Sequence, residues 1–212
     1  MRGSAMSKIL LIMLVSYLLG SLNPAAFISM LKKKNLREMG TGNLGATNTM
    51  LTFRKKYGVM VMLFDVIKAV ISVNIAKLVL PKMILAGITA GVCTMIGHIF
   101  PFYLNFQGGK GVAAFAGTLL AIDPFLFQML LVICIVIAIW CNYAAAAPVS
   151  AAVLAPIIGG IRAQSAGVFF LFLIAGALII FKHLKNFEKI QNGTEMKISD
   201  FVKSHFRESC EM

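Results

Sequence analysis

The chain has 212 residues, of which 59% are hydrophobic and only 13% are charged. Soluble globular domains carry about 25% charged residues, so this composition excludes an ordinary soluble domain, and its hydrophobicity excludes a disordered chain. We therefore expect an integral membrane protein. The formal net charge of +12 would suit nucleic acid in a soluble protein. In so apolar a chain it indicates cytoplasmic loops beside anionic lipid, and we expect no nucleic acid partner.

The ends of the chain are expected to lie outside the membrane domain. Residues 1–5 resemble a vector-derived leader in front of a natural initiator, Met6. We expect a single membrane domain over residues 6–194 and a cytoplasmic tail over residues 195–212.

Long apolar stretches predict the membrane spans, because a helix crosses the roughly 30 Å hydrocarbon core with about 20 residues. They predict spans at 9–31, 57–80, 83–97 and 163–181, with a short one at 111–122. Residues 124–161 carry no charge and are too many for one crossing, so we place a break at Asn142-Tyr143, with Pro148 shortly after it. The predicted fold class is an all-α integral membrane protein with seven transmembrane helices.

Polar groups interrupt two of these spans. Asp65 and Lys68 are three residues apart, face the same way on a helix and can neutralise each other. The run Gly20-Ser21-Leu22-Asn23-Pro24 weakens the helix in the middle of the first span. Such a break either lines a functional cavity or makes a kinked packing site, and the sequence leaves both open.

Basic residues predict the orientation, because short cytoplasmic loops carry an excess of Lys and Arg. With the N-terminus outside and the C-terminus cytoplasmic, 14 Lys and Arg residues lie on the cytoplasmic side and five lie outside. The same orientation brings segments 32–56, 98–110 and 141–147 and the residues after 181 to the cytoplasmic face. We expect them to form a single site there.

The first glycine-rich segment is Gly40-Thr41-Gly42-Asn43-Leu44-Gly45. It matches the glycine pattern of dinucleotide-binding proteins, but it lacks the strand and the βαβ unit that this pattern requires. With Thr47 and Asn48 just downstream, it instead favours an anion held by backbone N–H groups. The alternative is a flexible turn at the membrane surface.

The second glycine-rich segment is Gly108-Gly109-Lys110-Gly111. It is not an ATP-binding P-loop, because no Ser or Thr follows the lysine to hold magnesium. Its glycines let backbone amides approach a phosphate, Lys110 adds a charge, and the N-terminus of a helix follows. The alternative is a glycine-rich linker with an interfacial lysine.

Two histidines and an asparagine add polar groups to the same face. His98 precedes the second glycine-rich segment, and His183 and Asn186 lie among lysines where the last span ends. They suggest groups that bind or orient a polar ligand. The alternatives are hydrogen-bonded interface residues and, around His183, a basic belt for lipid headgroups.

Taken in order, these motifs resemble one family. Gly20-Ser21, the segment 40–48, Gly97-His98-Ile99-Phe100-Pro101 and the segment 106–113 closely resemble the bacterial acyl-phosphate:glycerol-3-phosphate acyltransferases, from about residue 10 to residue 194. The resemblance implies a multi-pass enzyme of the bacterial inner membrane. It would transfer a fatty acyl group from acyl phosphate to the 1-hydroxyl of glycerol 3-phosphate, giving lysophosphatidic acid and phosphate. The implied partners are these substrates and bilayer lipids, with no metal and no cofactor.

The resemblance also implies roles for individual residues. The catalytic set would be Lys110, Ser21, His98, His183 and Asn186. Lys110 would bind phosphate, Ser21 would complete the anion cradle, the two histidines and Asn186 would order the acceptor, and the bound phosphate itself would take the hydroxyl proton. The substrate- and phosphate-binding residues would be Gly40, Thr41, Gly42, Asn43, Gly45, Thr47, Asn48, Gly108, Gly109 and Gly111.

Four positions depart from the family pattern. Leu51 and Asn142 stand where family members commonly have Arg, Gln107 where a basic residue is usual, and Ala145 where Ser is common. Lost charges predict weaker phosphate binding. The alternative function is therefore a diverged paralogue with weak or no turnover that binds anionic lipid or phosphate and acts as a regulator or partner. A third alternative is a transporter, which only the pair Asp65 and Lys68 favours.

Overall fold

The computed structural model describes residues 2–200, which form helices joined by turns. The predicted tail lies outside the described residues from 201 onward, and the predicted leader and domain boundaries stay predictions. The elements of the described part are α1 (Arg2–Ser21), α2 (Pro24–Leu31), α3 (Ala46–Thr52), α4 (Lys55–Val79), α5 (Ile84–Ile99), the 3₁₀ turn η1 (Phe102–Leu104), α6 (Val112–Ile122), α7 (Pro124–Cys141), α8 (Ala146–Ala163) and α9 (Ala166–Gln191).

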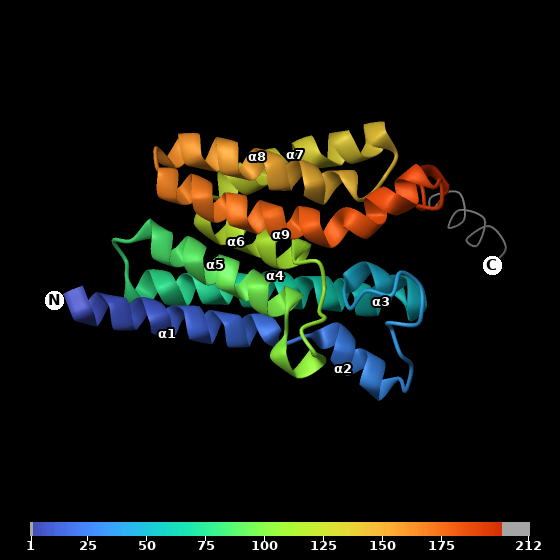
Figure 1. Cartoon of the computed structure of the whole chain (residues 1–212), viewed down its shortest axis with the longest axis horizontal. Helices are drawn as coiled ribbons and strands as arrows, with labels where there is room; N and C mark the ends of the chain where they lie inside the picture. The colour runs from blue at the N-terminus through green and yellow to red at the C-terminus, as the bar shows by residue number, and fades with distance from the viewer. Residues whose placement is uncertain (1, 201–212) are drawn as a thin grey trace.

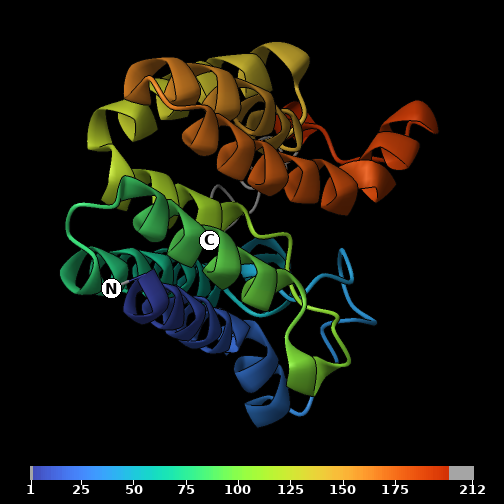
Figure 2. The ribbon, with the colours of Figure 1, turned by 60° about the vertical axis from the view of Figure 1, so that its left-hand side comes forward.

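The long helices form two layers (Figures 1 and 2). One layer contains α1, α4 and α5, the other contains α7, α8 and α9, and α6 packs between them against α4, α5 and α7. The main core lies where the layers meet, and the Phe115 and Phe172 rings touch edge to face there with centroids 6.1 Å apart. The two layers are therefore joined by apolar packing along α5, α6 and α9.

Within residues 2–200, six helical segments are long and apolar enough to cross a membrane. They are Ala5–Leu31, Lys55–Val79, Ile84–Leu104, Pro124–Cys141, Ala146–Ala163 and Ala166–Gln191. Helices form at all the predicted positions, but α6 has 11 residues and is only about 16 Å long, roughly half of a hydrocarbon core. The all-helical membrane fold is confirmed, while the seventh crossing and the orientation stay predictions.

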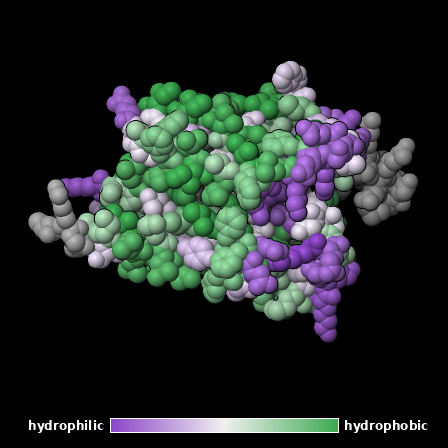
Figure 3. All heavy atoms as spheres, in the orientation of Figure 1, coloured by the Kyte–Doolittle hydropathy of each residue, from purple (hydrophilic) through white to green (hydrophobic). Residues whose placement is uncertain are grey.

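The surface agrees with burial in lipid. Side chains such as Leu78 and Trp140 are 82% and 86% exposed, which an aqueous surface would disfavour. Figure 3 shows apolar residues covering most of the visible face, while hydrophilic residues gather at the end opposite the N-terminus. The α2–α3 loop, the α5–α6 loop, the α7–α8 turn and the end of α9 all lie at that hydrophilic end (Figure 1).

The structure confirms both predicted helix breaks. Asn23 separates α1 from α2, where its side-chain oxygen accepts a hydrogen bond from the Ala26 amide at 2.9 Å and Pro24 begins the new helix. Asn142 ends α7 in the left-handed conformation, with φ of 60°. Both breaks place polar backbone groups at or near the hydrophilic end, where the candidate site lies.

Candidate functional site

The second glycine-rich segment folds back onto the end of α5. The Gly108 amide donates to the Ile99 carbonyl at 2.9 Å, and the Gly109 amide donates to the His98 carbonyl at 3.1 Å. A Cβ added at Gly109 would overlap the His98 ring, so only glycine permits this approach. Two of the four amides expected to bind phosphate therefore donate within the protein.

The start of α6 offers the remaining amides. Gly111 precedes the helix with φ of 83° and caps it without a side chain. Within residues 2–200, no hydrogen bond uses the backbone N–H groups of Lys110 and Gly111. The first turn of a helix presents further unpaired N–H groups and the positive end of its dipole. This place is therefore suited to an anion.

Lys110 is fixed beside this helix start by a chain of polar groups. Its ammonium donates to Asn186 Oδ1 at 2.6 Å, and Asn186 Nδ2 donates to Glu195 Oε1 at 2.7 Å. Burial lowers the pKa of Lys110, the Glu195 carboxylate opposes this shift, and Lys189 and Lys182 add to it. The structure thus brings together two predicted site residues, Lys110 and Asn186, with a carboxylate that sequence reasoning missed.

His183 lies one turn before Asn186 on α9. Its ring is buried, and Nδ1 is 2.7 Å from the Ile179 carbonyl oxygen. A carbonyl oxygen can only accept, so Nδ1 carries a proton and Nε2 is the nitrogen left for another partner.

The first glycine-rich segment is organised around Asn48. This side chain is fully buried, donates to the Leu36 carbonyl at 2.7 Å and accepts from the Thr41 amide at 2.8 Å. Leu36 and Leu44 are buried against α2 and α4. The loop is therefore pinned at both ends by apolar contacts and in the middle by one amide, which argues against a flexible turn.

The other residues expected in this loop occupy its turns and the start of α3. Gly40 and Gly42 have φ of 55° and 72°, values that favour glycine. Gly45 caps α3 without a side-chain hydrogen bond. Thr47 is exposed and Asn43 is half-buried. The loop thus has polar groups at its surface beside a rigid interior.

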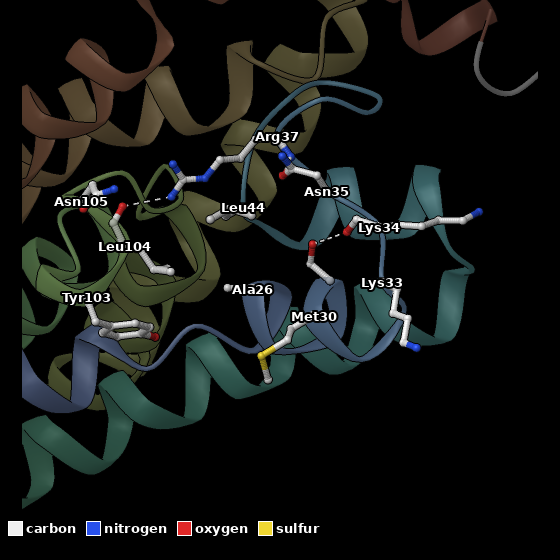
Figure 4. A pocket seen from close by; sticks show the side chains of 11 residues that line it. Ala26, Met30, Lys33, Lys34, Asn35, Arg37, Leu44, Tyr103, Leu104 and Asn105 are labelled. Atoms are coloured by element: carbon white, nitrogen blue, oxygen red, sulfur yellow. Dashed lines mark hydrogen bonds between the residues drawn. The ribbon is translucent and has the colours of Figure 1, made fainter.

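Arg37 links the residues that precede the two glycine-rich segments. Its guanidinium donates to Gln107 Oε1 and to the Gln107 carbonyl, both at 2.8 Å, and to the Leu104 carbonyl at 3.0 Å. Figure 4 shows Arg37 reaching Leu104 beside a groove of about 590 Å³ that Lys33 and Lys34 also line. Sequence reasoning missed Arg37 as part of the site. Gln107, where the sequence analysis expected a basic residue, is held by this arginine.

A buried charge cluster lies behind the second glycine-rich segment. Lys68 Nζ is 2.7 Å from Asp65 Oδ1, which confirms the predicted neutralising pair. The ammonium also donates to the Gly20 and Leu22 carbonyls at 2.8 Å each. His98 Nδ1 is 3.2 Å from both Lys68 Nζ and Asp65 Oδ1. The pair thus has structural partners in α1 and α5.

Ser21 lies at the helix break beside this cluster. It is buried, and its hydroxyl donates to the Tyr17 carbonyl at 2.9 Å. The Tyr103 hydroxyl donates to the Ser21 carbonyl at 2.8 Å. Within residues 2–200, no hydrogen bond connects Ser21 to Lys110. The structure therefore joins Ser21 to the helix break and not directly to the Lys110 chain.

The other three positions at which the sequence analysis expected different residues have distinct environments. Leu51 is 40% exposed, and Ala145 is buried. Asn142 binds the segment after α9: its Nδ2 donates to Ser199 Oγ at 3.0 Å, and its Oδ1 accepts from the Ser199 amide at 2.9 Å. In the described part of the chain, no three or more His, Cys, Asp or Glu side chains lie together as metal ligands.

Comparisons with known proteins show the family to which the chain belongs. A family model described as glycerol-3-phosphate acyltransferase matches residues 10–193. The glycerol-3-phosphate acyltransferase of Aquifex aeolicus is 33% identical over 190 residues, which cover 89% of this chain and 98% of that protein. The enzyme of that name from Clostridioides difficile is 35% identical over 195 residues, which cover 89% of this chain and 95% of that protein.

Two solved structures have the same fold. The crystal structure of PlsY (YgiH), an integral membrane glycerol 3-phosphate acyltransferase, in its glycerol 3-phosphate form has a TM-score of 0.83 and 32% identity, and the match covers 90% of this chain and 95% of that chain. Its lysophosphatidic acid form has a TM-score of 0.81 and 30% identity, covering 91% and 96%. Because the family model and these relatives span nearly the whole chain, the protein belongs to the glycerol-3-phosphate acyltransferase family.

Proposed function

We propose that this protein transfers a fatty acyl group from acyl phosphate to the 1-hydroxyl of glycerol 3-phosphate, giving lysophosphatidic acid and inorganic phosphate. The observation that carries the proposal is the Lys110 ammonium beside the start of α6, which has no side-chain cap, with Asn186 as the hydrogen-bond partner of the ammonium. This combination supplies a positive charge and free N–H donors for a phosphate.

The reaction needs positioning more than a protein nucleophile. The hydroxyl oxygen attacks the acyl carbonyl carbon, the bond from that carbon to the phosphate oxygen breaks, and the hydroxyl proton moves to a phosphate oxygen. An acyl phosphate is an activated mixed anhydride, so no Ser or Cys intermediate is required. The site contributes by holding two phosphate groups close together and stabilising the charge that develops in the transition state.

The predicted residue roles fit this chemistry with two changes, one to the role of Gly108 and Gly109 and one to the role of His98. Lys110 and its own amide, with that of Gly111, bind phosphate, while Gly108 and Gly109 let the segment pack against His98. Nε2 of His183 and the amide of Asn186 orient the acceptor. The loop over residues 40–48 contributes exposed N–H and hydroxyl groups, and Ser21 and His98 support the cradle from the helix break.

The experiment is a donor comparison in detergent with radiolabelled glycerol 3-phosphate. Palmitoyl phosphate should give labelled lysophosphatidic acid and one inorganic phosphate per product, whereas palmitoyl coenzyme A and palmitoylated acyl carrier protein should give none. Product formation from either thioester, with none from palmitoyl phosphate, would contradict the proposed donor.

We further propose seven crossings, with the N-terminus outside and the hydrophilic end on the cytoplasmic face of a bacterial inner membrane. The basic residues at the hydrophilic end support this orientation. Single cysteines at Asn43 and Lys82, in a background without the native cysteines, should report opposite sides. An impermeant maleimide that labels position 43 from outside intact cells would contradict the orientation.

A second candidate function is binding without turnover. It is favoured by Leu51 and Ala145, because an apolar side chain at either position donates no hydrogen bond to phosphate. Under this alternative, glycerol 3-phosphate would bind in equilibrium dialysis while palmitoyl phosphate gave no product.

A further inference from the structure

The buried Lys68 ammonium has more polar neighbours than protons to donate. An ammonium carries three N–H groups and no acceptor. Lys68 Nζ lies 2.7 Å from Asp65 Oδ1 and 2.8 Å from each of the Gly20 and Leu22 carbonyl oxygens. These three acceptors use all three protons. The fourth neighbour, His98 Nδ1, is farther away at 3.2 Å, so Lys68 has no proton left for it.

The same count places the proton on the His98 ring. Nδ1 is also 3.2 Å from Asp65 Oδ1, and an ionised carboxylate can only accept. A bare Nδ1 would set two lone pairs against each other, whereas an Nδ1–H group donates to the carboxylate. A neutral ring also leaves the buried cluster with one positive and one negative charge, so no charge is uncompensated. His98 therefore carries its proton on Nδ1, and Nε2 is a bare acceptor.

Nε2 lies beside the second glycine-rich segment. A Cβ added at Gly109 would meet Nε2 more closely than any other atom of the His98 ring. The His98 side chain is 5% exposed, and within residues 2–200 no hydrogen bond uses Nε2. In the same part of the chain, Thr52 Oγ1 is the fully enclosed side-chain nitrogen or oxygen that lacks a partner. Nε2 lacks one too, so it is not fully enclosed and can accept from a ligand.

The chemistry of the site limits which ligand group can use this acceptor. Phosphate oxygens without a proton only accept hydrogen bonds, so a bare Nε2 disfavours them. A phosphate that carries a proton offers an O–H donor instead. In the proposed reaction the hydroxyl proton moves to a phosphate oxygen, so the phosphate that leaves is hydrogen phosphate. Nε2 therefore complements the phosphate in its protonated form.

We propose that His98 Nε2 accepts a hydrogen bond from the O–H group that the phosphate acquires in the reaction, and that Asp65 and Lys68 are positioning residues that keep Nε2 free of a proton. The hydroxyl oxygen bonds to the acyl carbon, the bond from that carbon to the phosphate oxygen breaks, and the hydroxyl proton stays on the phosphate. His98 neither gains nor loses a proton. This inference rests on the proposed function, because it concerns the same phosphate.

A comparison of inorganic phosphate with sulfate tests the acceptor without turnover. The two anions are similar in size and tetrahedral shape, but sulfate carries no proton at neutral pH. Each is used to displace radiolabelled inorganic phosphate from the protein in equilibrium dialysis in detergent. We expect phosphate to bind about 10- to 100-fold more tightly than sulfate, the scale expected when a polar group of the site is left unpaired.

Three variants separate the acceptor from the packing of the ring. His98→Asn keeps a donor toward Asp65 but has no atom at the place of Nε2, so the two anions should bind within about twofold of each other. Asp65→Asn combined with Lys68→Met permits either His98 tautomer, because an amide both donates and accepts, and should reduce the preference for phosphate. Ser72→Ala is the matched control. Ser72 is buried on α4, and its hydroxyl donates to the Lys68 backbone carbonyl. Its loss should leave the preference unchanged.

The tautomer itself is read by ¹⁵N NMR of ring-labelled histidine in the ligand-free protein. The chain has three histidines, and the His98 signals are assigned by their loss in His98→Asn. The parent and Ser72→Ala should show a protonated Nδ1 and a bare Nε2, whereas Asp65→Asn with Lys68→Met should show both tautomers.

The outcomes distinguish this inference from the proposed function. A protonated Nε2 in the parent, equal affinity of the parent for the two anions, or a parent-like preference in His98→Asn would each overturn the inference while leaving the phosphate site in place. Absence of phosphate binding to the parent would instead contradict the phosphate site, and with it both proposals. The two measurements on the parent keep the inference testable if a variant does not fold.

Discussion

The buried cluster behind the second glycine-rich segment predicts a large loss of stability for Lys68→Met. Lys68 and Asp65 are 3% and 2% exposed, and the ammonium contacts the carboxylate and two carbonyls of the α1–α2 break. Methionine fills a similar volume but leaves Asp65 without its cation. Removing one partner of a buried pair costs about 3–5 kcal/mol. That is about two to three and a half orders of magnitude in the folding equilibrium.

The assay is thermal unfolding in detergent. For a chain of this size each kcal/mol shifts Tm by about 2–4 °C, so Lys68→Met should lower Tm by roughly 6–20 °C. Lys55→Met, at an exposed position at the start of the same helix, is the control and should change Tm little. Asp65→Asn combined with Lys68→Met should recover much of the loss, because no uncompensated charge remains. A Tm for Lys68→Met within about 2 °C of the parent would refute the reasoning.

Three further predictions concern activity, each measured as lysophosphatidic acid formed from palmitoyl phosphate. Lys110→Ala should lower turnover about 100-fold or more with Tm unchanged, because one preorganised charged donor is lost; parent-like turnover would mean that the segment is only a linker. Gly109→Ala should lower activity, because its Cβ would overlap the His98 ring and displace the segment; an active, equally stable variant would contradict that contact. Leu51→Arg with Ala145→Ser should raise activity by about ten- to a thousandfold if two charge-assisted or hydroxyl contacts to phosphate are restored. No gain over a parent that already turns over robustly would mean that other residues, such as Arg37, bind the phosphate instead.

Much of this protein's fold was determined by local sequence. Apolar stretches predicted the long helices and α6, because membrane crossing requires about 20 such residues whatever their neighbours are. They did not predict the short helix α3. Asn23-Pro24 and Asn142 predicted the two breaks, because a capping side chain, a proline and a left-handed residue act on their own turn of backbone. The pairing of Asp65 with Lys68 was predictable for the same reason, since the two residues are one helical turn apart. The motif order also predicted Lys110 and Asn186 as site residues, and the structure places them in contact.

Only the tertiary structure decided which side chains meet across the hydrophilic end. Arg37 meets Gln107 across 70 residues of sequence, and Lys110 meets Asn186 across 76. Periodicity and spacing report which face of one helix a residue occupies, but not which face of another helix it touches. Glu195 is close to Asn186 in sequence and accepts a hydrogen bond from it, yet Asn142 holds the segment that follows Glu195, and that contact joins residues 57 positions apart. The tertiary structure also explains how so short a helix as α6 is stable. Its neighbours α4, α5 and α7 surround it and supply the packing that its own 11 residues cannot provide.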